Sequence, residues 1–151
     1  MTNQIEKQVE ISAPLPRVWK ALTDYQQFGE WFRVRLDGPF VEREAVGGQI
    51  TFPGYEHLRM DIVVQAIRPM SYFSYTWHPY AVDPREDYSQ ETPTLVEFRL
   101  EETSGGTRLV VTESGFDKLP PERFADAFRM NSRGWEQQLD NIRVYVGAPA
   151  L

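Results

Sequence analysis

Cysteine is absent from this 151-residue sequence, so disulfide bonds, thiolate metal sites and a thiol nucleophile are all excluded. Histidine is scarce: His57 and His78 stand alone, without the His-x-x-x-His spacing of a metal site, and no metal or cofactor is expected. Gly-x-Ser-x-Gly and the glycine-rich phosphate loops are also missing. These absences give no support to hydrolase, nucleotide-binding and dinucleotide-binding functions.

The sequence also lacks long apolar runs and any cluster of basic residues. No stretch approaches the ~20 apolar residues of a membrane span, and the N-terminus does not resemble a secretion signal. With 16 Lys and Arg against 22 Asp and Glu, the net charge of -6 opposes nucleic acid. We therefore expect a cytoplasmic protein that neither spans a membrane nor binds nucleic acid.

The length and the aromatic content favour one folded domain over residues 1–151. A chain of this size buries roughly 68 to 70% of the surface that its unfolded form exposes. Aromatic residues make up 13% of the chain, which supplies large rigid side chains for a core or for the wall of a cavity.

Hydrophobic periodicity predicts an α+β fold. Alternation predicts a first strand over Ile5 to Ile11, and Ser12-Ala13-Pro14 begins a short helix that ends near Thr23. A second short helix holds Tyr25 to Phe32. From Val34 to Ser114, alternating segments separated by turn residues predict an antiparallel meander with one dry face, which includes Met60, Ile62, Val64 and Ala66. The stretch from His78 to Thr94 has neither period and is predicted to be a long loop.

A long helix is predicted over Phe124 to Val146, opened by Pro120-Pro121-Glu122. Six apolar residues fall within an arc of roughly 60°, and this stripe should pack on the sheet: Phe124, Phe128, Trp135, Leu139, Ile142 and Val146. Asn131 interrupts the stripe and should meet a neighbour, a water or a ligand, because an unpaired buried amide costs about 1 to 3 kcal/mol. Gly134 indicates a close approach, a bend or a tolerated glycine.

Several residues on the dry face are candidates for a binding site. The parity of Glu113 with Leu109 and Val111 aims its carboxyl at this face, where it is either paired or solvated, or acts as an acid or base with a raised pKa. The aromatic candidates are either core residues or the wall of an apolar pocket. The predicted ligand-binding set is Trp31, Tyr75, Trp77, Phe98, Glu113, Phe128, Asn131 and Trp135. No catalytic set is identified.

Motifs along nearly the whole chain resemble the START-like (SRPBCC) superfamily. The opening Ile11-Ser12-Ala13-Pro14, followed by Arg17 to Asp24 and then Trp31-Phe32, carries the likeness. Ser74 to Trp77, Gly106 to Phe116, and Gly134-Trp135 with Leu139 resemble its Aha-type branch, named after the activator of the heat-shock-protein-ninety ATPase.

This resemblance implies a helix-grip fold, in which a curved antiparallel sheet wraps around a long C-terminal helix and leaves an internal apolar cavity. In the superfamily such cavities hold lipids, polyketides or similar molecules. The family has no universal catalytic set. Many relatives have His at the position of Glu113, so an acid or base role does not transfer to this residue.

Three functions remain open from the sequence. Binding of a small apolar or aromatic ligand is favoured over catalysis. The first alternative is a cyclase, dehydratase or hydrolase that uses Glu113 as acid or base. The second is a chaperone cofactor that resembles the Aha-type ATPase activators.

Overall fold

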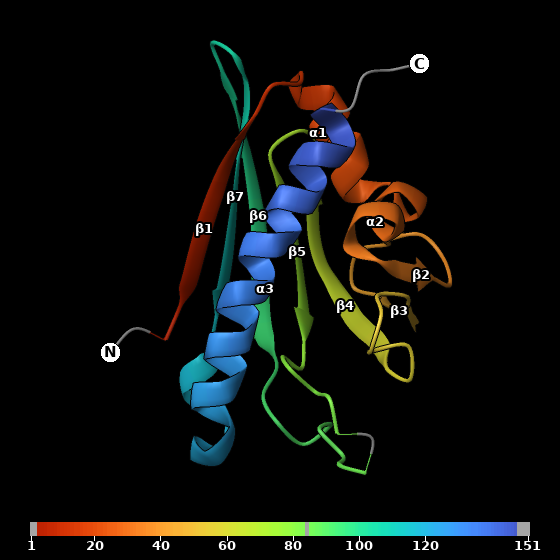
Figure 1. Cartoon of the computed structure of the whole chain (residues 1–151), viewed down its shortest axis with the longest axis vertical. Helices are drawn as coiled ribbons and strands as arrows, with labels where there is room; N and C mark the ends of the chain where they lie inside the picture. Colours follow the sequence, from red (N-terminus) through yellow and green to blue (C-terminus); the bar gives the residue numbers. More distant parts are fainter. Residues whose placement is uncertain (1–2, 84, 148–151) are drawn as a thin grey trace.

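In a computed structural model, residues 3–83 and 85–147 are described, and they form a curved antiparallel sheet with a long helix across one face (Figure 1). The sheet has seven strands in the order β1-β7-β6-β5-β4-β3-β2. The strands are β1 (Ile5–Ile11), β2 (Val34–Leu36), β3 (Ala45–Ile50), β4 (Arg59–Arg68), β5 (Tyr72–Trp77), β6 (Thr94–Thr103) and β7 (Gly106–Ser114). Only β1 leaves the meander, because it pairs with β7 at the far edge.

Two short helices, α1 (Leu15–Thr23) and α2 (Tyr25–Phe32), connect β1 to β2, as the sequence predicts. Asp24 separates them, and its carboxylate accepts hydrogen bonds from the backbone N–H groups of Gln26 and Gln27 at 2.9 and 3.2 Å. Such an N-cap satisfies donors that the first helical turn leaves unpaired. In the helix that follows the cap, Phe28, Trp31 and Phe32 are all buried in the core.

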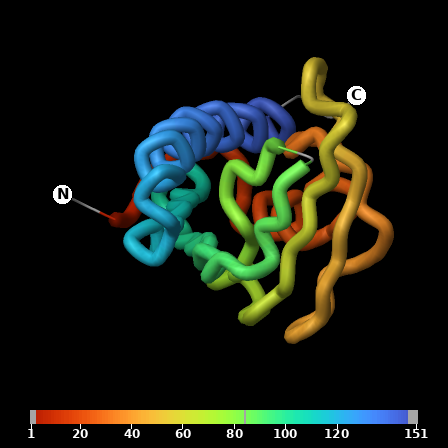
Figure 2. The backbone as a smooth tube through the Cα atoms, turned by 90° about the horizontal axis from the view of Figure 1, so that it is seen from below, coloured from red at the N-terminus to blue at the C-terminus, as the bar shows by residue number. Residues whose placement is uncertain are grey.

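The predicted long helix is α3 (Pro121–Gly147), which follows the short 3-10 helix η1 (Phe116–Lys118). It packs against β1 and α2, and the sheet curves around it (Figure 2). The C-terminal part of the predicted stripe, from Trp135 through Leu139 and Ile142 to Val146, is buried. Phe124 and Phe128 are partly buried and stack on each other with 5.9 Å between ring centroids. The structure is the helix-grip fold that the sequence predicts.

The prediction for Ala66 is wrong. Met60, Ile62 and Val64 lie on the buried face of β4, but the pairing with β5 shifts between Val64 and Ala66. This bulge inserts an extra residue, so the residues after it face the opposite side of the sheet from the one that strict alternation predicts. As a result Ile67, and not Ala66, lies opposite the buried Phe73.

Candidate functional site

Glu113 is the centre of a buried polar cluster on the concave face of the sheet. Its place on β7 follows from the alternation that also buries Leu109 and Val111. Across the sheet, Glu113 pairs with Val96 of β6, which in turn pairs with Tyr75 of β5. The side chain of Glu113 has no exposed surface.

Four side chains donate hydrogen bonds to the Glu113 carboxyl group. Trp77 Nε1 and Thr94 Oγ1 donate to Oε2 at 2.7 and 2.6 Å. Trp135 Nε1 donates to Oε1 at 2.8 Å. The Asn131 amide nitrogen lies 2.9 Å from Oε1 and 3.2 Å from Oε2. Both carboxyl oxygens are therefore fully engaged by donors from β5, β6 and α3.

The electrostatics of Glu113 reflect two opposing effects. Burial raises its pKa above the ordinary value, while the hydrogen bonds from Thr94, Trp77, Trp135 and Asn131 lower it. Burial is the larger effect, so the pKa is raised. Within residues 3–83 and 85–147, Glu113 forms no ion pair that could compensate its charge.

Tyr75 lies beside this cluster with its hydroxyl buried and without a hydrogen-bond partner among the described residues. Burial raises the pKa of the Tyr75 phenol well above its ordinary value, and the nearby Glu113 charge raises it further. The phenol therefore stays protonated beside the carboxyl group.

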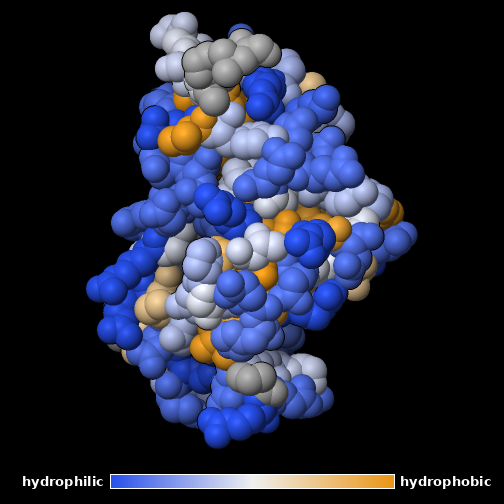
Figure 3. All heavy atoms as spheres, turned by 45° about the vertical axis from the view of Figure 1, so that its right-hand side comes forward, coloured by the Kyte–Doolittle hydropathy of each residue, from blue (hydrophilic) through white to orange (hydrophobic). Residues whose placement is uncertain are grey.

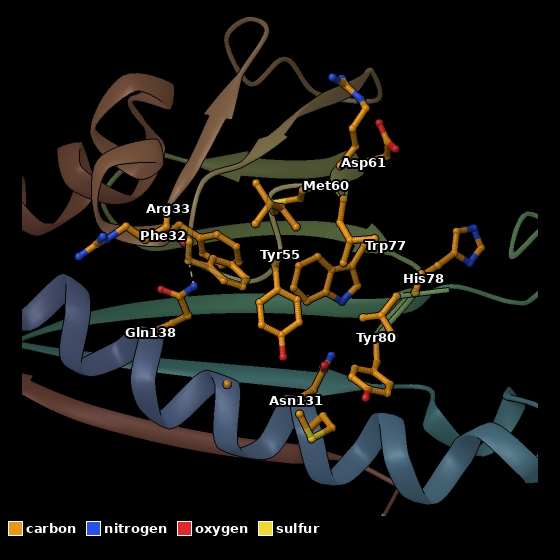
Figure 4. Close-up of a pocket in the computed structure, with 18 of the residues that line it drawn as sticks. Phe32, Arg33, Tyr55, Met60, Asp61, Trp77, His78, Tyr80, Asn131 and Gln138 are labelled. Carbon is orange, nitrogen blue, oxygen red and sulfur yellow. Dashed lines mark hydrogen bonds between the residues drawn. The ribbon is translucent and has the colours of Figure 1, made fainter. Parts of the chain in front are cut away.

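A pocket with a volume of about 830 Å³ opens next to the cluster, between α3, the ends of β3 and β4, and the loop of residues 78–93. Figure 4 shows Tyr55, Trp77 and Tyr80 projecting toward a common space above Asn131. The Phe, Tyr and Trp side chains of its wall are Phe32, Phe52, Tyr55, Trp77, Tyr80, Tyr88 and Trp135. On the surface, hydrophobic residues are visible between hydrophilic ones (Figure 3).

The pocket and the buried cluster divide the predicted site residues between them. Trp77, Asn131 and Trp135 line the pocket and also donate to Glu113. Tyr75, Phe98 and Glu113 are fully buried behind the lining residues. Trp31 is a core residue whose indole N–H donates to the Ala21 carbonyl at 2.8 Å. Phe128 packs edge-on against Phe116, outside the lining.

Of the three alternatives for Gly134, a close approach, a bend or a tolerated glycine, the structure excludes the close approach. A Cβ atom built on Gly134 would have no atom within 4 Å, and the residue lines the pocket. Gly134 is exposed on the wall of the pocket, so its missing side chain brings no backbone closer and leaves open space at this place.

The loop of residues 78–93 contributes much of the pocket wall, which the sequence did not predict residue by residue. Arg123 of α3 fixes this loop: its guanidinium donates to both Glu91 carboxylate oxygens at 2.7 and 2.8 Å. It also donates to the carbonyl groups of Pro79 and Tyr80 at 2.8 and 2.9 Å and lies over the Tyr88 ring. Arg123 thus holds the loop, and with it Tyr80 and Tyr88, against the end of the pocket.

Thr94 is a further residue that sequence reasoning missed. Its parity with Val96, Phe98 and Leu100 would have placed it on the dry face, had the strand been extended by one step.

Within residues 3–83 and 85–147, no group of three or more His, Asp or Glu side chains could hold a metal ion. None of the described helices is long and apolar enough to cross a membrane.

Comparisons with solved structures agree with this fold. A Mesorhizobium loti protein, MLL2253, is 24% identical with a TM-score of 0.77, and the match covers 98% of this chain and 99% of that one. The Aha1 dimer structure from Colwellia psychrerythraea is 18% identical with a TM-score of 0.72, covering 99% and 100%. DynU16, a protein in the dynemicin biosynthetic locus, is 20% identical with a TM-score of 0.75, covering 98% of this chain but 48% of that chain. At these identities the likeness shows the fold alone.

A search of curated proteins gives no match. The model of one protein family matches residues 12–147, which include every element from α1 to α3. The match spans the buried cluster, the pocket wall and, from Ser12 onward, the motifs that carry the family resemblance. The chain therefore belongs to the family described as Activator of Hsp90 ATPase homolog 1-like protein.

Proposed function

We propose that this protein binds a small apolar or aromatic molecule in the pocket between α3, β3, β4 and the loop of residues 78–93. The observation that carries the proposal is the pocket itself, with a volume of about 830 Å³ and a wall rich in aromatic rings. Ligand pockets of roughly 300 to 1,000 Å³ with such linings are typical of small-molecule sites. Burial of a ligand there would contribute roughly 25 cal/mol per Å² of apolar area.

Gly134 supports this proposal, because a helix of this length gains about 1 kcal/mol from alanine in place of an interior glycine. The glycine therefore weakens α3 while it keeps volume open in the pocket. A protein that only needed the helix for packing would gain from a side chain at this position.

The buried position of Glu113 does not favour catalysis by this residue. A general acid or base must come within hydrogen-bond reach of the reacting proton. Glu113 has no exposed surface, and four donors already occupy both of its oxygens. Its carboxyl group instead accepts hydrogen bonds from three residues of the pocket wall, Trp77, Asn131 and Trp135.

The proposal can be tested with the neutral fluorescent probe N-phenyl-1-naphthylamine. We expect Gly134→Leu to retain the fold and to weaken probe binding about tenfold or more, since a leucine side chain would enter the pocket. Fluorescence titration gives the affinity, and thermal unfolding checks the fold.

Gly147→Leu is the matched control, because Gly147 ends the same helix, has open space around it and lies outside the pocket lining. It should leave probe affinity unchanged. Equal affinity of the Gly134→Leu variant and the unsubstituted protein would contradict binding in this pocket.

A further inference from the structure

The Asn131 amide has a fixed orientation, because its neighbour is a carboxyl group with both oxygens accepting. The nitrogen donates to Glu113 at 2.9 and 3.2 Å, and only the NH₂ end of an amide can donate. Exchange of the amide nitrogen and oxygen would place an acceptor against two acceptors. Glu113 therefore determines which end of Asn131 points away from the cluster.

The other end of the amide, Oδ1, faces the pocket. Asn131 lines the pocket, and Oδ1 has no hydrogen-bond partner in the described part of the chain. Oδ1 is also not among the buried atoms that lack a partner. The atom is thus accessible, and it offers an acceptor with unused lone pairs to whatever enters the pocket.

The indole N–H groups of Trp77 and Trp135 already donate to Glu113. These two residues present only their ring surfaces to a ligand. The hydroxyls of Tyr55 and Tyr80 can donate or accept, so they do not discriminate between ligands. Elsewhere the lining holds charged groups, the donors Arg33 and Arg59 and the acceptors Asp61, Asp83 and Glu86. Beside the Trp77 and Trp135 rings, Asn131 Oδ1 is the acceptor whose orientation Glu113 fixes.

We infer that the pocket selects flat apolar molecules that carry a hydrogen-bond donor, such as a phenol or an aromatic amine, over those that carry only an acceptor. This inference rests on the proposed binding function and names the class of ligand. A donor group would bond to Asn131 Oδ1 while the rest of the molecule lies against Trp77 and Trp135. An ether or carboxylate at the same place would face Oδ1 with lone pairs on both sides.

Glu113 acts here as a positioning residue. It touches no ligand. Through Asn131 it determines that this part of the wall offers a hydrogen-bond acceptor and not a donor. In a Glu113→Gln variant the new amide can donate to Asn131 Oδ1, which allows the Asn131 amide to turn its nitrogen toward the pocket.

The test compares 2-naphthol, a donor, with 2-methoxynaphthalene, an acceptor, by displacement of N-phenyl-1-naphthylamine. On apolar area alone, the extra methyl group favours the ether by about fourfold. We expect the unsubstituted protein to prefer the naphthol. The ratio of the two affinities should fall about fivefold to tenfold in Asn131→Leu, because one neutral hydrogen bond is lost.

Glu113→Gln should also shift the ratio toward the ether, which a purely structural role of Glu113 would not do. If that variant does not fold, Asn131→Leu and Asn131→Ala carry the test. Arg133→Leu is the control, because Arg133 is an exposed residue of α3 outside the pocket lining. It should leave the ratio unchanged.

Two results would overturn the inference in distinguishable ways. If both naphthalenes bind with a ratio that Asn131→Leu leaves unchanged, the selection for donors is wrong while the pocket still binds. If none of the three compounds binds, the proposed function fails, and the inference fails with it.

Discussion

Glu113 brings a carboxyl group into an apolar interior, where four neutral donors surround it and no ion pair forms with any described residue. Neutral donors stabilise the ionised form less than a cation would, so burial still raises the pKa of Glu113. A raised pKa means that the folded protein holds this proton to higher pH than the unfolded chain does. The contribution of Glu113 to stability must then decrease as the pH rises.

We expect Glu113→Gln to destabilise the fold by about 1–3 kcal/mol at neutral pH, because the new NH₂ group meets donors. The difference in unfolding free energy between the unsubstituted protein and this variant should also depend on pH. It should be constant below about pH 4, fall by at most about 1.4 kcal/mol per pH unit above the ordinary glutamate pKa of about 4.3, and level off above the raised pKa.

Urea unfolding at a series of pH values measures this difference. Glu102→Gln, at an exposed position of β6, should change stability by less than about 0.5 kcal/mol. A difference that increases with pH would mean that the pKa of Glu113 is lowered, contrary to the structure.

At the scale of elements, the loop of residues 78–93 depends on α3 for its position. Arg123 forms a bidentate ion pair with Glu91 and donates two hydrogen bonds to backbone carbonyl groups. The side chains of Arg123 and Glu91 are both mostly buried. A planar guanidinium suits this arrangement, and a lysine cannot reproduce it. The aromatic residues that close the end of the pocket are thus held by a residue outside the loop.

Arg123→Lys should therefore loosen the loop without unfolding the sheet. We expect faster amide hydrogen exchange over residues 79–92, unchanged protection of β6 and β7, and a loss of about 1–2 kcal/mol in stability. Arg129→Lys, whose partner Asp126 is exposed on the same helix, provides the control. Unchanged exchange in the loop would show that Arg123 does not hold it.

The elements themselves were predictable from the sequence because their periodicity reflects burial. The stripe from Trp135 to Val146 and the alternation of β7 each predict a buried face that the structure confirms. The bulge at Ala66 was not predictable, because no residue near Gln65 marks it. The roles of Arg123 and Thr94 depend on partners distant in sequence, namely Glu91 with the loop backbone and Glu113. Alternation could place Thr94 on a face, but it could not pair it with a carboxylate.

At the scale of the whole molecule, Trp135 joins the layers. Its ring lies against Phe32, Trp77 and Phe98, and its N–H reaches Glu113. One side chain of α3 therefore connects α2, β5, β6 and β7. The sequence predicts Trp135 in the apolar stripe, but its hydrogen bond depends on Glu113 of β7, which is 22 residues away in sequence.

Trp135→Ala should cost about 3 to 5 kcal/mol of unfolding free energy, since it opens a large cavity and removes a donor from Glu113. Urea unfolding measures the loss, with Val144→Ala as a control at a position that is 55% exposed on the same helix. A loss below about 1 kcal/mol would mean that Trp135 is not the connection between layers.

The two indole N–H groups that share the Glu113 carboxyl group also make the site observable in solution. Both protons lie in short hydrogen bonds of 2.7 and 2.8 Å, one to each oxygen of the same group. In a proton NMR spectrum, their resonances should lie downfield of those of solvated indoles and should exchange slowly with deuterium. Because one carboxyl group holds both, a molecule that enters the pocket and moves one ring should shift the two signals together, so the protein carries its own pair of spectroscopic probes.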